Sequence, residues 1–262
     1  MSIIFCLKLV LVPLLIMGIT LAGRRWGPAV AGWLSAFPVV AAPVLLFISL
    51  DQGARFAASA AAGTLAAVLA ILVFGIGYAW AATRFSWGIS LTAAFACYLV
   101  AVTCLTLWAP SVGVVAPIVV AALLVVSRLF PEPPLIVASS APPNDIAWRM
   151  AAGAALVVSL THFSPRLGPQ LSGLFAMFPI MLSVLVVFSH RHAGAGFAIK
   201  LLRGTVLGYY GFATFCVALS LSLSTVGIGA AFALSLSCAA IVQAISRVYL
   251  LRVQSSRLSS EP

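Results

Sequence analysis

Apolar runs of about 20 residues follow one another along the chain, and they constrain its fold more than any other feature. A helix of about 20 apolar residues crosses the roughly 30 Å hydrocarbon core of a bilayer. We expect nine runs to do so. They cover residues 3–22, 29–50, 56–82, 87–109, 112–130, 145–163, 170–189, 197–223 and 226–250.

The composition supports a membrane location. Hydrophobic residues make up 63% of the 262 residues and charged residues only 7%. A soluble domain needs far more polar surface to meet water. Transmembrane barrels show alternating apolar residues rather than long apolar runs, and the remaining way to satisfy the backbone in lipid is the helix. We therefore predict an all-α polytopic membrane protein.

Two of the nine spans need a separate argument. Residues 87–130 exceed what one helix requires, and Pro110 is a natural turn, so we divide this stretch into two spans. The first run could be taken for a signal peptide, but no basic segment precedes it and Lys8 interrupts it. We expect it to remain as a membrane span.

One short stretch occurs twice, 141 residues apart. Residues 27–38 and 168–179 both read Gly-Pro, then Gly, then Phe-Pro at the same spacing. The same offset aligns further identical residues: Thr20 and Thr161, Arg25 and Arg166, Phe47 and Phe188, Gly53 and Gly194, Gly63 and Gly204, Phe74 and Phe215, and Cys97 and Cys238. Shared hydrophobicity alone does not explain this register, so we predict a repeat of four spans.

The repeat divides the chain into four parts. Residues 1–110 form the first four-helix repeat, and residues 144–253 form the second. Residues 111–143 hold a linker helix and a Pro-rich loop, and residues 254–262 form a polar tail. Because the linker helix adds a fifth crossing, the second repeat enters the membrane from the opposite side. The predicted architecture is two inverted repeats.

Loop charges are consistent with this arrangement. The formal net charge is +10, which we assign to anionic lipid headgroups rather than to nucleic acid. Nine spans place eleven basic residues on one side and three (Lys8, Arg55 and Arg166) on the other, which predicts an external N-terminus and a cytoplasmic C-terminus. An eight-span alternative gives ten against four with the N-terminus inside, so span length rather than charge favours nine.

Each copy of the repeated stretch continues into a longer pattern. The positions are Ala31-Gly32-Trp33, Phe37-Pro38 and Gly53 in the first copy, and Ser172-Gly173-Leu174, Phe178-Pro179 and Gly194 in the second. This pattern resembles the GlpM-type small bacterial membrane proteins, which look like single four-span units. The chain departs from them by its duplication. The resemblance implies a bacterial inner-membrane location. The family is associated by name with glycerol metabolism and exopolysaccharide production, and it implies no settled activity.

The Phe-Pro pairs are the first candidates for a functional site. Pro38 and Pro179 fall inside predicted spans, where proline removes a backbone hydrogen bond and leaves a carbonyl without its partner. Broken helices at equivalent positions of two repeats indicate substrate sites in transporters. A packing kink is the simpler alternative. The candidate substrate-binding residues here are Pro38, Pro179, Phe37, Phe178, Gly32 and Gly173, although close helix packing alone would explain the glycines.

Two basic residues complete the candidate set. Lys200 and Arg203 lie three residues apart on one face of a predicted helix. They either extend to lipid phosphates or attract an anionic substrate. His190 and His192 precede them, but no carboxylate or cysteine accompanies these histidines in a metal-binding pattern.

The acidic residues argue against several functions. Asp51, Glu132, Asp145 and Glu261 all fall in loops or at span edges, whereas proton-coupled and cation transporters usually bury a carboxylate within a span. The sequence contains no catalytic Ser/His/Asp pattern and no phosphate-binding loop, so we expect neither an enzyme nor a cofactor. The five cysteines lie in apolar runs without a CxxC pair, and we expect no metal site.

Two functions remain from different classes. The first is a transporter of a neutral or anionic solute, or of a lipid-like molecule, that works between inverted halves. The second is a non-transporting scaffold in envelope or exopolysaccharide assembly, which would need no intramembrane acid. The substrate, the direction of transport and a homo-oligomeric state are left open by the sequence.

Overall fold

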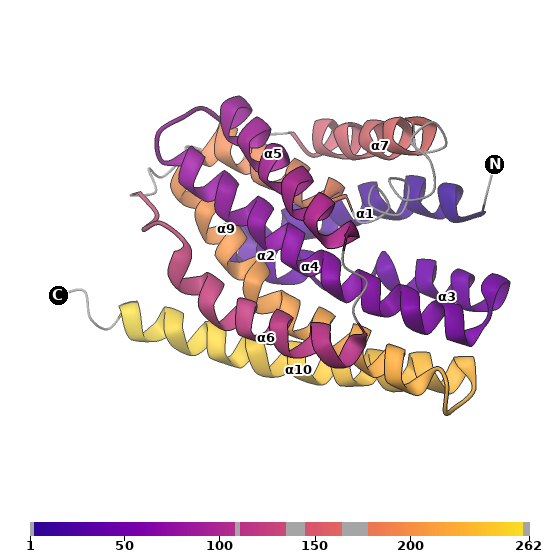
Figure 1. Ribbon diagram of the computed structural model, residues 1–262. Coiled ribbons are helices and arrows are strands. Elements are labelled where there is room, and N and C mark those ends of the chain that lie inside the picture. Colours follow the sequence, from indigo (N-terminus) through magenta and orange to yellow (C-terminus); the bar gives the residue numbers. More distant parts are fainter. Residues whose placement is uncertain (1–2, 108–110, 135–144, 164–177, 259–262) are drawn as a thin grey trace.

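The computed structural model of the protein describes residues 3–107, 111–134, 145–163 and 178–258, and these residues form helices joined by short turns (Figure 1). The helices are α1 (Ile3–Trp26), α2 (Pro28–Ser35), α3 (Ala41–Gln52), α4 (Ala54–Ala82), α5 (Trp87–Thr106), α6 (Val112–Leu129), α7 (Ile146–Phe163), α9 (Ile180–Ser222) and α10 (Ile228–Leu258). The all-α prediction is confirmed for these residues.

Six helices of the described chain are long and apolar enough to cross a membrane. The apolar segments are Leu9–Trp26, Ala54–Ala82, Trp87–Leu105, Val112–Leu129, Ile180–Ser222 and Ile228–Val248. Helix α3 and the Ile146–Ser159 part of α7 are apolar but shorter. The helices indicate a multi-pass membrane protein, while the predicted count of nine spans exceeds the six found by length and composition.

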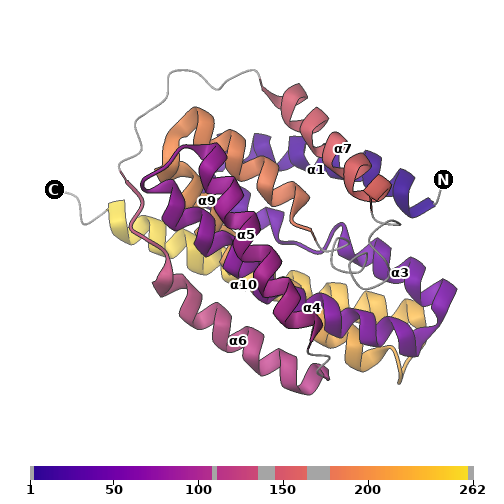
Figure 2. The ribbon, with the colours of Figure 1, turned by 45° about the horizontal axis from the view of Figure 1, so that its top comes forward.

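Helices α4 and α9 form the centre of the bundle. About two-thirds of the α4 segment is buried (67%), and 61% of the α9 segment, against 22% for α5 and α6 and 28% for α10. Helix α5 packs on α4, α10 packs on α9, and α6 lies against both central helices (Figures 1 and 2). The outer helices therefore present apolar side chains such as Val100, Leu124 and Ile241 to the surroundings, as lipid requires.

The predicted span 29–50 is divided in the structure. Its residues form α2 and α3, with a turn over residues 36–40 that contains Pro38. This is the result expected where proline interrupts the backbone hydrogen bonds of a helix. The predicted separation of spans 87–109 and 112–130 is matched by two helices, α5 and α6.

The predicted spans 170–189 and 197–223 meet in a different way. The residues labelled α9 form two helices that meet directly at a kink at Gly194, which has φ 80° and ψ 173°. The connection between α3 and α4 is also a single glycine, Gly53, with φ 85° and ψ 166°. A polar loop between helices is therefore unnecessary at either position, because glycine alone adopts this backbone conformation at low cost.

Helices at matching positions of the repeat run in opposite directions. In Figure 1, α4 leads into its loop to α5 at the upper left, whereas α9 leads into its loop to α10 at the lower right. These two loops correspond at the offset of 141 residues, because α5 begins at Trp87 and α10 begins at Ile228. Helices α5 and α10 accordingly run in opposite directions in the same view.

Candidate functional site

The first Phe-Pro pair lies in the break between α2 and α3. The amide of Val39 donates a hydrogen bond to the carbonyl of Phe37 (2.8 Å), which closes a tight turn around Pro38. The amide of Ala42 then donates to the carbonyl of Pro38 (2.9 Å) and begins the next helix. Pro38 is buried, and Phe37 packs against the hydrophobic core.

The second Phe-Pro pair makes the same two hydrogen bonds at the start of α9. The amide of Ile180 donates to the carbonyl of Phe178 (2.7 Å), and the amide of Ser183 donates to the carbonyl of Pro179 (2.8 Å). Pro179 has φ −77° and ψ 57°, the geometry of an inverse γ-turn. The two Phe-Pro pairs thus share a local turn structure, while residues 164–177, which precede the second pair, lie outside the described residues.

The second break is surrounded by aromatic rings. Phe178 stacks on Phe95 with ring centroids 4.8 Å apart and meets Tyr98 edge-on at 5.7 Å. Phe95 contacts Phe74 on α4 at 5.4 Å. A row of rings therefore runs from Phe178 to the buried centre of α4 and packs the start of α9 against α5.

The predicted packing glycines lie at the contact between α2 and α9. A Cβ atom at Gly32 would overlap the backbone carbonyl of Leu201, and one at Gly204 would overlap that of Ala29. Gly208 lies in the same way against Trp33. Gly32 therefore serves close helix packing in this structure. Gly173, its predicted counterpart, lies outside the described residues.

The two predicted basic residues of α9 have different surroundings. Lys200 is exposed. Arg203 is half-buried, and its Nη2 atom donates to the carbonyls of Phe130 (3.1 Å) and Pro131 (3.0 Å), directly after α6. Carbonyls at the C-terminal end of a helix attract cations. Arg203 therefore links the end of α6 to α9 by hydrogen bonds, whereas the side chain of Lys200 is exposed.

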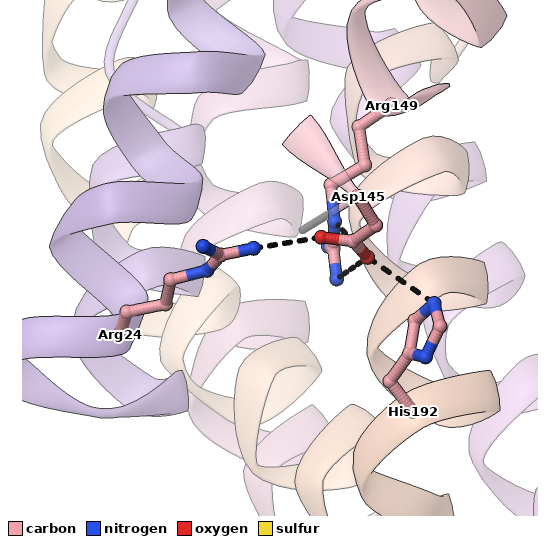
Figure 3. A network of polar contacts seen from close by, with 4 residues as sticks. All are labelled: Arg24, Asp145, Arg149 and His192. Atoms are coloured by element: carbon pink, nitrogen blue, oxygen red, sulfur yellow. Dashed lines mark hydrogen bonds and ion pairs between the residues drawn. The ribbon is translucent and has the colours of Figure 1, made fainter. Parts of the chain in front are cut away.

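A cluster of charged side chains forms a second candidate site (Figure 3). The carboxylate of Asp145 lies directly before α7. Its Oδ1 atom accepts from Arg24 Nη2 (2.7 Å), and its Oδ2 atom accepts from Arg149 Nε (2.9 Å) and Nη2 (2.8 Å). His192 Nε2 lies 3.2 Å from the same Oδ2 atom. Three elements, α1, α7 and α9, meet at this carboxylate.

The members of this cluster differ in exposure. Asp145 and Arg149 are buried, with 5% and 6% of their surface exposed. The side chains of Arg24 and His192 are 25% and 31% exposed. The guanidinium carbon of Arg149 lies 5.1 Å from the centre of the Phe188 ring, which adds a cation–π contact. Two members of the cluster are therefore buried and two are partly exposed.

A second histidine lies beside the cluster on α9. His190 Nδ1 is 3.1 Å from the hydroxyl of Tyr78, so α4 is also linked to this end of the bundle. The described residues hold no group of three or more His, Cys, Asp or Glu side chains arranged for a metal ion. The chemistry available at the cluster is the binding of oxygen anions by guanidinium and imidazole groups.

Sequence reasoning placed Asp145 at a span edge and assigned it no role. One signal was present in the sequence, because Asp145 and Arg149 are four residues apart at the start of a helix and can pair along its surface. The contribution of Arg24 and His192 depends on how α1 and α9 pack against α7, which no local pattern reveals.

No protein-family model, curated protein or solved structure matches this chain. The class of protein therefore rests on the fold and the site of the described residues: an all-α, multi-pass membrane protein with two Phe-Pro turns of the same local structure and a partly buried charge cluster.

Proposed function

We propose that this protein is a transporter that carries an anionic or neutral solute, or a lipid-like molecule, across the bacterial inner membrane between two inverted halves. The observation that carries this proposal is the pair of Phe-Pro breaks with the same hydrogen bonds at matching positions. Helices broken at equivalent positions of two repeats supply substrate and ion sites in known transporter folds.

Three features support the inverted halves. Gly53 and Gly194 share one backbone conformation and lie 141 residues apart. The connections that follow α4 and α9 lie at opposite ends of the bundle (Figure 1). Helix α6 is an extra crossing between the repeats, and an odd number of crossings reverses the direction of the second unit. We propose that each repeat derives from a four-helix unit of the GlpM type.

The helix ends at the Phe-Pro turns favour an anionic substrate. Helix α3 and the first part of α9 both begin directly after a turn, where the amides of Ala42 and Ser183 already donate to the proline carbonyls. The N-terminal end of a helix carries a partial positive charge. This charge favours an anion or an electron-rich solute over a cation.

The charge cluster also favours a negatively charged substrate. Arg24 and Arg149 together carry two positive charges against the single negative charge of Asp145. A site with surplus positive charge and partial burial attracts anions. We therefore propose anionic solutes ahead of neutral ones.

The test is flux through the purified protein in proteoliposomes. The probes are radiolabelled inorganic phosphate, acetate and a fluorescent anionic phospholipid. We expect the wild-type protein to move one of them, and Pro38→Ala and Pro179→Ala each to lower that flux at least fivefold at equal protein content, because a restored helix closes the break.

The matched control is Pro117→Ala. Pro117 lies inside α6, a helix that belongs to neither repeat, so this change should leave the flux unaltered. Loss of flux in the control, or wild-type flux in both break variants, would contradict the assignment of the breaks. A wild-type protein that moves none of the probes and co-purifies with a stable partner would favour the scaffold function instead.

A further inference from the structure

Three exposed basic residues lie around the short helix α2. Arg25 lies in the last turn of α1, directly before α2, and its guanidinium carbon is 5.6 Å from the centre of the Trp26 ring. Arg247 of α10 lies over the ring of Trp33, which belongs to α2, at 5.9 Å. Lys200 belongs to α9, and its side chain is exposed. The three residues therefore come from three elements that are far apart in the sequence.

The packing of α2 against α9 places Lys200 near the start of α2. Gly204 lies against Ala29. One turn further along both helices, Gly208 lies against Trp33, so α2 and this part of α9 run in roughly the same direction. Lys200 precedes Gly204 by one helical turn, which brings it to the end of α1. Because α2 has 8 residues, the three basic residues are attached around a stretch of helix roughly 12 Å long.

The same surface lies at the ends of two apolar segments. The apolar segment of α1 ends at Trp26, and that of α10 ends at Val248. The end of a membrane-spanning segment lies at the level of the lipid headgroups, where tryptophan is also enriched. Arg25 and Arg247 each come one residue before such an end. The phosphate groups of surrounding lipids are therefore within reach of these long side chains.

The basic residues of this surface have no acidic partner among the residues that the structure describes. The ion pairs there all involve Asp145, and none includes Arg25, Lys200 or Arg247. Each of the two arginines is held over an indole ring by a cation–π contact. The N–H groups of a guanidinium held in this way are still able to donate to the oxygens of a phosphate group.

We propose that Arg25, Lys200 and Arg247 form a binding surface for the phosphate group of an anionic phospholipid. The exposed ring of Trp26 packs against the lipid below its headgroup. Three positive charges select against a zwitterionic lipid, because its headgroup also carries a positive charge. A lipid bound here contacts the ends of α1 and α10 and the side of α9. This surface does not depend on the proposed transport function.

The test is lipid binding measured by native mass spectrometry of the purified protein in neutral detergent. The probes are phosphatidylglycerol and phosphatidylethanolamine with identical acyl chains. We expect the wild-type protein to bind phosphatidylglycerol about tenfold more tightly or better, since each basic residue beside anionic lipid contributes about fivefold in affinity. The triple variant Arg25→Gln/Lys200→Gln/Arg247→Gln should bind the two lipids with about equal affinity.

A second triple variant is the matched control. Arg84→Gln/Arg128→Gln/Arg191→Gln removes the same charge from exposed arginines of the α4–α5 loop, the end of α6 and the part of α9 before Gly194. This variant should keep most of the preference for phosphatidylglycerol. An equal loss in the two triple variants would show that only the total charge matters, and it would overturn the surface. A wild-type protein without any preference would overturn it as well.

Two further measurements complete the test. The substituted side chains are all exposed, so both triple variants should unfold at nearly the wild-type Tm. If the first triple variant does not fold, Lys200→Gln is measured alone and should lower the preference about fivefold. Displacement of bound phosphatidylglycerol by sodium phosphate, but not by sodium chloride of equal ionic strength, would assign the surface to free anions and contradict the lipid. Because no flux is measured, these failures are separate from a failure of the transport function.

Discussion

At the scale of single residues, one methyl group decides how closely α2 approaches α9. Gly204→Ala would place a Cβ atom against the backbone carbonyl of Ala29. Backbone cannot yield as a flexible side chain does, so we expect a loss of about 1–3 kcal/mol of stability, as for other overpacked cores. Thermal unfolding in detergent measures this loss.

Gly63 supplies the control for this prediction, because it occupies the matching position of the first repeat. It is exposed on α4, so Gly63→Ala should be neutral or slightly stabilising, by up to about 1 kcal/mol, from the higher helix propensity of alanine. Equal destabilisation by both changes would show that packing against α2 is not the cause.

Individual residues also show which contacts could be predicted from the sequence and which could not. The small size of glycine was sufficient to predict close packing at Gly32 and Gly204, but the same interpretation of Gly63 was wrong, because no neighbour lies within 4 Å of a Cβ atom added there. The role of Arg203 was not predictable, because its partners Phe130 and Pro131 follow a helix that the repeat does not contain. Asp145 was missed for a related reason: its burial is produced by packing between α1 and α7.

At the scale of helices, two glycines determine where helices change direction. Gly53 and Gly194 have φ of 85° and 80° with extended ψ, a combination that costs other residues about 1–3 kcal/mol. We expect Gly53→Ala and Gly194→Ala each to lower stability by about this amount, although neither glycine has a neighbour that a Cβ atom would touch.

Gly88→Ala is the control for these two changes. Gly88 lies in the first turn of α5, also with no neighbour within 4 Å of an added Cβ atom, but it is not among the glycines with positive φ. Denaturation of all three variants in one detergent separates backbone strain from a general effect of the methyl group. Equal stability of the three would show that the strain is absent.

The helix breaks were the most predictable part of this level of structure. Proline weakens a helix by removing an N–H group, and this effect is visible in the sequence. Pro13 and Pro117 nevertheless lie inside α1 and α6, so the division of span 29–50 at Pro38 also depends on how the surrounding helices pack. The division between spans 170–189 and 197–223 was predicted, and the structure places it at a single glycine, Gly194, rather than in a longer loop.

At the scale of the whole molecule, nine crossings together with the distribution of charge predict the orientation in the membrane. Reporter fusions at the C-terminus and in the loop 131–147 should both report the cytoplasm, and a fusion at the N-terminus should report the outside. A periplasmic signal from the loop or from the C-terminus would contradict nine crossings.

The whole-molecule arrangement was only partly accessible from the sequence. Apolar runs predict helices in a membrane, and the repeat predicts which helices correspond. Neither predicts that α4 and α9 form the buried centre while α5, α6 and α10 lie outside, since mean hydropathy does not separate the two groups: α4 (2.2) lies within the range of the outer helices (2.0–2.4) and α9 (1.4) lies below it. That order is determined by side-chain complementarity between helices, as in the rings of Phe95 and Phe178.

The interruption of α9 at Gly194 separates residues 180–193 from the rest of the helix. Residues 180–193 form an arm about 21 Å long at 1.5 Å per residue, with Gly194 at one end and Phe178-Pro179 just beyond the other. A rotation of about 10° at that glycine displaces the far end of the arm by about 4 Å, more than the radius of a water molecule. The charge cluster contacts this segment at His192, two residues before Gly194. A small movement there corresponds to a larger movement at the far end of the segment.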